Sequence, residues 1–236
     1  MDDPALAAAL GALQGTAQDP STFSRPFVEM FPVSGAAVST VGDLLGSETL
    51  SASDRLAARV DELQFDLGEG PCWDAMNKAL PVLEPDIRNN PCTVWPAFSP
   101  AILDHDISSL FAFPLLVGPL RIGAVDLYSS YAVDLDHTQS KQAATMAGAV
   151  GRNILRRALD AIGGDYDDTG NAYSRRLIHQ AAGVVLAQLR VPADDALLII
   201  QGQAFASSRS MMEVAQDIVD ARLSFSRSDH GIETST

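Results

Sequence analysis

The stretch DLGEGPCWDAMNKALPVLEPDI, residues 66–87, combines a turn, a helix and a strand. Gly68 and Gly70 favour the turn. Pro71 suits the first position of a helix, where its missing backbone N–H is not needed. The segment PVLEPDI at the end of the stretch predicts a short strand. These residues therefore indicate a domain in which helices accompany a sheet.

Hydrophobic periodicity extends this pattern over the first 162 residues. Residues 33–43 and 48–53 predict strands, and residues 53–68 predict an amphipathic helix. Residues 108–117 and 121–129 predict two further strands, joined by a tight hairpin at the sequence GPL. Helices are expected over residues 4–15, 21–31 and 136–162. This order predicts an α+β fold with an antiparallel sheet flanked by helices.

The last of these helices has an apolar stripe at spacings of three and four residues. Its members are Ala147, Val150, Ile154, Ala158 and Ala161. Such a stripe is compatible with the core of the domain or with the seam of a dimer, and the sequence does not separate the two.

A second region follows the sequence GGDYDDTGN, residues 163–171, whose glycines and aspartates predict a solvated linker between a domain at 1–162 and one at 172–226. The second domain is predicted to be a bundle of three helices, and residues 227–236 are expected to be a disordered tail. Ser210 and Glu213 form the pattern of a capping box at the start of the third helix. The three helices are expected within residues 173–189, 192–205 and 210–225.

Charge is distributed unevenly over the 236 residues, whose formal net charge is −14. Residues 1–170 contain 10 Lys and Arg against 23 Asp and Glu, whereas residues 171–227 contain 6 Arg against 5 Asp and Glu. Only the second region could therefore approach a phosphate backbone without strong repulsion. The acidic start of the chain and the lack of an apolar run of roughly 20 residues favour a cytoplasmic protein.

Neither a metal site nor an enzyme active site is predicted. Cys72 and Cys92 lack the spacing of a redox or zinc motif, and the four histidines show no ligand pattern. No nucleophile–base pair and no phosphate-binding glycine loop is recognisable. Cys72 is expected to be a small buried residue, because the neighbouring Glu69 and Asp74 oppose the thiolate that a redox role would need.

The first region resembles a GAF domain, a sensor fold with a central antiparallel sheet. The resemblance rests on residues 66–87, with the pattern GEGPC-x-D-A followed by P-V-L-x-P-D, and on the later segments FAFPLLV and GAVDLYS. This form of the motif is typical of an actinobacterial subset. The resemblance implies that a small-molecule or protein signal is sensed over the sheet, and it specifies no cofactor.

Candidates for the ligand pocket follow from position on the strands and on the helix after the GEGPC turn. Aromatic residues at alternating strand positions are also common in a core, so this alternative stays open. The candidates are Trp73, Phe111, Phe113, Asp126 and Tyr128.

The second region resembles the ANTAR domain, a three-helix RNA-binding module of transcription antitermination regulators. The matching segments are IHQAAGVVLAQLRVPADDALLII, residues 178–200, and SRSMMEVAQDIV, residues 208–219. The two resemblances together cover nearly the whole chain. They imply a homodimeric regulator whose ANTAR domain binds paired stem-loops in nascent RNA.

Two basic positions of the ANTAR pattern are neutral in this chain. Ala182 stands where the family commonly has a lysine, and Gln201 stands where it commonly has an arginine. Arg209 keeps the basic residue of the Asn-Arg pair before the third helix, while Ser208 replaces its asparagine. Fewer phosphate contacts would lower the affinity for RNA and weaken its dependence on salt.

Five arginines remain as candidate RNA contacts, although each could instead only solvate a helix face. They are Arg175, Arg176, Arg190, Arg209 and Arg222. Stacking on RNA bases would have to use Tyr173, Phe205 or Phe225, of which the last two could be core residues. The main alternative is therefore a ligand-responsive module for protein interaction or dimerisation that has lost RNA binding.

Overall fold

A computed structural model describes residues 3–15, 19–42, 45–162, 175–228 and 231–235. The chain folds into two compact units, Met1–Tyr173 and Ser174–Thr236. The predicted linker at 163–171 lies outside the described residues. Among the residues that the structure does describe, no helix is long and apolar enough to cross a membrane.

The first unit is built on a five-stranded sheet with the strand order β2-β1-β5-β4-β3, in which neighbouring strands are antiparallel. This architecture confirms the predicted α+β fold. The strands are β1 (Gly35–Thr40), β2 (Glu48–Ala52), β3 (Val82–Glu84), β4 (Ser109–Val117) and β5 (Leu120–Ser129). The helices are α1 (Pro4–Gln14), α2 (Arg25–Met30), α3 (Arg55–Leu67), α4 (Pro71–Lys78), α5 (Phe98–Leu103) and α6 (His137–Ile162), with a 3-10 turn at Pro20–Thr22.

Local sequence explains where α3 and α4 begin and end. The Asp54 carboxylate accepts hydrogen bonds from the N–H groups of Leu56 and Ala57, which would otherwise be unpaired in the first turn of α3. Gly68 ends α3 in the left-handed conformation, with φ +65°. Pro71 then occupies the first turn of α4, as predicted.

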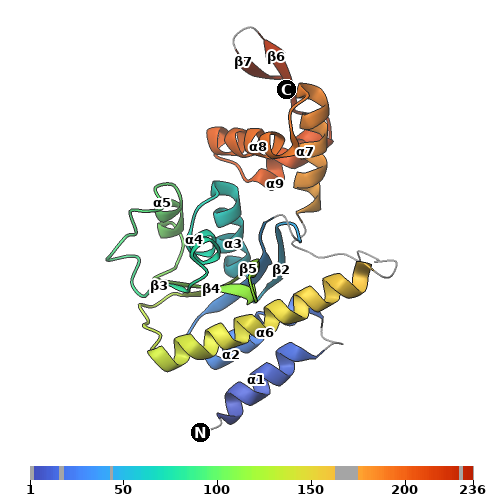
Figure 1. Cartoon of the computed structure of the whole chain (residues 1–236). Coiled ribbons are helices and arrows are strands. Elements are labelled where there is room, and N and C mark those ends of the chain that lie inside the picture. The colour runs from blue at the N-terminus through green and yellow to red at the C-terminus, as the bar shows by residue number, and fades with distance from the viewer. Residues whose placement is uncertain (1–2, 16–18, 43–44, 163–174, 229–230, 236) are drawn as a thin grey trace. The chain divides into compact units, whose positions relative to one another are not determined.

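One face of the sheet packs against α6, with α1 and α2 on the same side (Figure 1). Ala147, Val150 and Ile154 of α6 are almost fully buried here, and they contact the apolar side chains of β4 and β5. These three residues of the α6 stripe therefore belong to the core of the first unit.

The buried Asn153 side chain fastens α1 to α6. Its Nδ2 donates to the carbonyl oxygens of Leu13 and Gly15, at 2.8 and 3.2 Å, and its Oδ1 accepts from Arg157 Nε at 2.9 Å. These bonds satisfy carbonyls at the C-terminal end of α1, which no helical N–H can reach.

The other face of the sheet is covered by α3, α4 and α5 (Figure 1). Trp95, Phe98 and Ile102 pack there with apolar residues of α3 and the strands. A smaller cluster joins α4 to β1 and β5 through Cys72, Met76 and Ala124.

The described residues of the second unit form three helices around a small core, as predicted. They are α7 (Arg176–Leu189), α8 (Ala193–Ser207) and α9 (Met211–Val219). The predicted capping box is confirmed: the Ser210 hydroxyl accepts from the N–H of Glu213, and the Glu213 carboxylate accepts from the N–H of Ser210.

The C-terminal residues differ from the expected disordered tail. Two strands, β6 (Ser224–Ser228) and β7 (Gly231–Ser235), form an antiparallel hairpin. Phe225 anchors it, because its side chain is buried and its N–H donates to Gln188 Oε1 at 2.9 Å. The sequence lacks a clear alternation of apolar residues here, which is why periodicity gives no strand signal.

We expect Asn153→Ala to destabilise the first unit by about 1–3 kcal/mol, because buried carbonyl groups lose their donor. Both tryptophans, Trp73 and Trp95, lie in this unit, so denaturation followed by tryptophan fluorescence reports on it selectively. Arg156→Ala, at an exposed position of the same helix, is the matched control and should change little. Equal stability of the two variants would contradict the role of Asn153.

Candidate functional site

The GEGPC turn is fixed by the side-chain contacts of Glu69 and by the backbone conformation of Gly70. Glu69 Oε1 accepts from the N–H groups of Ala97 and Phe98, at 2.5 and 2.6 Å, and so caps the start of α5. Gly70 has φ +133°, a conformation that residues with a side chain rarely adopt. The motif thus joins α3, α4 and α5 over one face of the sheet.

Gln64 of α3 is the residue against which this turn packs. Its Oε1 accepts from the N–H of Cys72 at 2.7 Å, and its carbonyl oxygen accepts from Trp73 Nε1 at 2.7 Å. A Cβ at Gly70 would lie 2.7 Å from the Gln64 side chain, so the contact also requires glycine.

Cys72 is buried in the apolar contact between α4 and the sheet, with 3% of its surface exposed. Both cysteines are thiols rather than a disulfide. The position of Cys72 favours the small buried residue over a redox-sensitive thiol, because an exposed thiolate is what oxidants attack.

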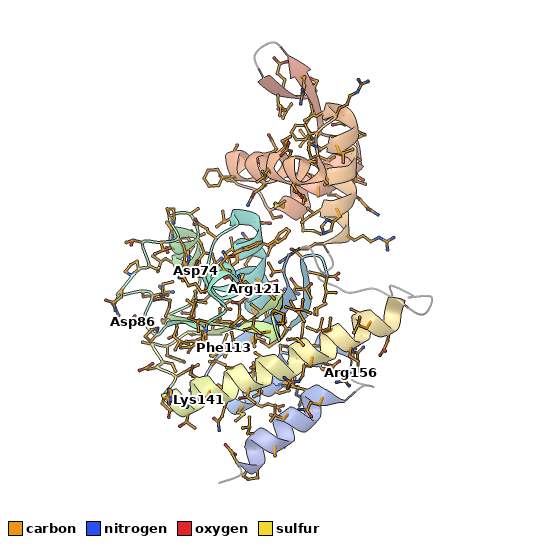
Figure 2. All side chains as sticks on the ribbon, in the orientation of Figure 1. Asp74, Asp86, Phe113, Arg121, Lys141 and Arg156 are labelled. Carbon is orange, nitrogen blue, oxygen red and sulfur yellow. The ribbon has the colours of Figure 1, made fainter. Side chains whose placement is uncertain are left out.

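The predicted pocket residues divide between the two faces of the sheet. Asp126 and Tyr128 of β5 face α3 and α4, and Trp73 contacts the cluster on that side. Phe111 and Phe113 instead belong to the core on the α6 side, where Figure 2 shows Phe113. The two phenylalanines therefore do not join the other candidates.

A bulge explains this separation. Next to the hairpin Val117 pairs with Leu120, but the register shifts by one residue between Leu115 and Leu116. Phe111 consequently pairs with Leu127 rather than with Asp126. Because paired residues share a face, the shift of one residue moves both phenylalanines to the opposite side from Asp126.

Tyr128 has a structural partner. Its hydroxyl donates to Asp54 Oδ1 at 3.0 Å, so it supports the carboxylate that caps α3. Burial and this hydrogen bond raise the pKa of the Tyr128 hydroxyl, which therefore stays protonated.

Asp126 is less firmly paired. Its side chain is buried in the central strand, and within the described residues neither carboxylate oxygen meets a donor in well-aligned hydrogen-bond geometry. Burial raises the pKa of this carboxyl well above its usual range, and the nearby Asp61 raises it further, whereas hydrogen bonding to the adjacent Gln64 side chain lowers it. Asp126 is thus the one carboxyl among the pocket candidates, and its pKa is strongly raised.

Sequence reasoning missed three polar residues around Asp126. Ser39 of β1 and Gln64 of α3 are buried, and Asp61 is also buried and accepts a hydrogen bond from the Thr49 hydroxyl. Polar residues at inward positions of an amphipathic helix were the available signal for Gln64 and Asp61. No group of three or more His, Cys, Asp or Glu in the described part of the chain is placed to hold a metal ion.

The candidate RNA contacts of the second unit differ in exposure. Arg176, Arg190, Arg209 and Arg222 are exposed, whereas Arg175 is only 5% exposed. Arg190 itself ends α7 in the left-handed conformation, and Arg209 and Arg222 directly follow the left-handed residues Ser208 and Ala221. Each of these three arginines therefore lies at the C-terminal end of a helix.

Arg209 and Arg222 share an acidic partner that the sequence did not reveal. Asp217 of α9 accepts from Arg209 Nη2 and from Arg222 Nε, each at 2.8 Å, and Arg222 also pairs with Asp220 at 2.8 Å. Hydrogen bonds from the two arginines lower the pKa of Asp217, and the bond to Asp217 raises the pKa of Arg222. The positive charge of both arginines is thus balanced by neighbouring carboxylates.

The other positions of the predicted RNA face are neutral or apolar. Ala182 is buried in the core of the unit and Gln201 is half-buried. Phe205 of α8 is 67% exposed, whereas Phe225 is buried and Tyr173 lies outside the described residues. Phe205 is therefore the described candidate with a face available for stacking.

We expect Asp126→Asn to change how the stability of the first unit depends on pH. A carboxyl with a raised pKa in the folded state stabilises less as the pH rises from about 4 to that pKa. Between these two pH values the free energy of unfolding of the variant should rise relative to that of the wild type by about 1.4 kcal/mol per pH unit. Below pH about 4 the difference between the two should be constant. Urea denaturation followed by tryptophan fluorescence at several pH values measures this; a difference independent of pH would contradict it.

Comparison with known proteins assigns both units. A sequence profile of the ANTAR domain matches residues 171–219. The solved GAF domain of an Acinetobacter phosphoenolpyruvate-protein phosphotransferase is similar with a TM-score of 0.53 at 10% identity, over 71% of this chain and 100% of that one. The corresponding Coxiella burnetii domain gives a TM-score of 0.52 at 13% identity, over 66% of this chain and 95% of that one. No curated protein matches in sequence. The chain therefore combines a unit with the GAF fold and an ANTAR domain.

Proposed function

We propose that this protein is a signal-responsive, RNA-binding regulator of transcription antitermination. The observation that carries the proposal is the ANTAR match at 171–219, which coincides with a three-helix unit bearing exposed arginines at three helix ends. In this proposal the GAF unit senses a signal and the ANTAR unit binds the loops of RNA hairpins. The protein acts in the cytoplasm as a homodimer, so that two ANTAR units engage two loops, and it catalyses no reaction.

The RNA contacts we propose come from two kinds of side chain. Arg176, Arg190, Arg209 and Arg222 contact phosphates, and Phe205 stacks on an unpaired base. Arg209 and Arg222 reach a phosphate only by giving up part of their pairing with Asp217, so the affinity of this surface is held down.

A second candidate function is docking of a protein through α8. It is favoured by Leu198 and Phe205, which are 64% and 67% exposed on this helix, and by the balanced charges around Asp217. Under this alternative the three-helix unit has kept its scaffold and has lost RNA binding.

The test is a titration of the full chain against RNA with two adjacent stem-loops, at low and high salt. Specific binding that weakens with salt and with Arg209→Ala supports RNA recognition. An RNA in which the loop sequences are scrambled but the stems are kept is the control. Equal binding to both RNAs, or none, would favour the docking function instead.

Asp217→Asn should strengthen RNA binding, because it releases Arg209 and Arg222 from a shared carboxylate. The logarithm of the affinity should fall more steeply with the logarithm of the salt concentration, by about 0.7 to 0.9 for each additional phosphate that is neutralised. Asp194→Asn, in the first turn of α8, changes the net charge equally without releasing either arginine and is the matched control. If both variants behave alike, only net charge matters.

Phe205→Ala should weaken RNA binding by about 1–3 kcal/mol, the value of one stacked base. The salt dependence should stay as in the wild type, because no phosphate contact is lost. Leu198→Ala removes an equally exposed apolar side chain from the same helix and should leave the affinity unchanged. A similar loss in both variants would speak against stacking.

A further inference from the structure

The β6–β7 hairpin is attached to the C-terminal end of α7 (Figure 1). The Phe225 side chain is buried, and the backbone N–H of Phe225 donates at 2.9 Å to Oε1 of Gln188, the residue before the last in α7. The hairpin and the end of α7 therefore form one surface of the second unit. The ANTAR match ends at residue 219, so this surface includes residues that the family profile does not cover.

Two exposed arginines flank this contact. Arg190 follows Gln188 by two residues, and Arg227 follows Phe225 by two residues. Two residues of backbone span at most about 7 Å, so the Cα atom of each arginine stays close to the residue that makes the contact. Both arginines therefore lie near the same end of α7, where one stretch of an extended ligand can contact them together.

Neither arginine is balanced by a carboxylate. Within the described ranges, Arg190 and Arg227 form no ion pair, whereas Arg209 and Arg222 both pair with Asp217. Arg227 also belongs to a strand, so it does not terminate a helix as Arg190 does. Arg227 can therefore meet an anion without giving up an existing partner.

Among the described residues of the hairpin, one face carries a positive charge and no negative one. Residues two apart in a strand share a face, and so do residues that pair across two strands. Arg227 therefore shares a face with Phe225 and with its cross-strand partner Ile232. Glu233 pairs with Ser226 and lies on the opposite face. An anion that approaches Arg227 thus comes from the side away from the Glu233 carboxylate.

We propose that the β6–β7 hairpin and the end of α7 bind the phosphate backbone of RNA through Arg227 and Arg190. A polyanion suits this surface, because each unpaired cation can take one phosphate and arginine binds a phosphate through two parallel N–H donors. The surface also lies in the part of the chain where Arg residues outnumber Asp and Glu, by 6 to 5 over residues 171–227. The inference rests on the proposed RNA binding and adds a contact outside the three helices.

The experiment titrates the full chain against the RNA with two adjacent stem-loops, at salt concentrations from about 50 to about 200 mM. Arg227→Ala removes one of the two cations. Arg190→Asn removes the other and places a residue there that tolerates the left-handed conformation, φ +56°. Arg227→Lys keeps the charge, and Arg156→Ala, at an exposed position of α6, is the control that removes one positive charge elsewhere.

We expect Arg227→Ala and Arg190→Asn each to weaken RNA binding. The logarithm of the affinity should fall less steeply with the logarithm of the salt concentration, by about 0.7 to 0.9 in each variant. The weakening should therefore be about threefold larger at about 50 mM than at about 200 mM salt. Arg227→Lys should keep the wild-type slope, because an ammonium still neutralises a phosphate. Arg156→Ala should keep it as well.

An unchanged slope in Arg227→Ala or in Arg190→Asn would overturn the proposal, and so would a reduced slope in Arg227→Lys. Arg227 is exposed, so replacing it should leave the fold intact, which circular dichroism checks. If the proposal fails while the wild type still binds the stem-loops specifically, RNA binding by the three helices stands. Absence of specific binding by the wild type would instead refute both the proposed function and this contact.

Discussion

The hydrogen bond from the Cys72 N–H to Gln64 Oε1 is the constraint on which the covered face of the sheet depends. It caps the first turn of α4 from α3, and it holds the carboxamide where only glycine fits at position 70. The same contact turns the NH2 group of Gln64 toward Asp126. One amide side chain thus fixes both the helical cover of the sheet and a polar contact beneath it.

Sequence reasoning recovers the parts of the fold that local chemistry determines. The hairpin of β4 and β5, the helix after Pro71 and the capping box at Ser210 each follow from residues close together in the chain. The grouping of Phe111 and Phe113 with Asp126 fails because of one bulge in β5, where Ile122 is the extra residue opposite Leu115 and Leu116. Such a shift of one residue reverses the face of every β5 residue beyond it, and no turn residue or break in the sequence announces it.

The candidate contacts of the ANTAR domain show a similar limit. The arginines are visible in the sequence, but their value depends on neighbours that come together only in the fold. Asp217 is one turn or more away from both Arg209 and Arg222 along the chain, yet it pairs with both. Counting basic residues therefore overestimates the positive potential of this surface, since part of it is already neutralised.

The position of three arginines at helix C-termini has a consequence for the energetics of RNA binding. The C-terminal end of a helix carries a partial negative charge, which a nearby cation stabilises. Arg190, Arg209 and Arg222 each occupy such an end, next to or within a left-handed turn formed without glycine. A phosphate that draws one of them away competes with the helix end for the same cation. Affinity for nucleic acid and stability of these helix C-termini therefore oppose each other. A sequence change that raises one should lower the other.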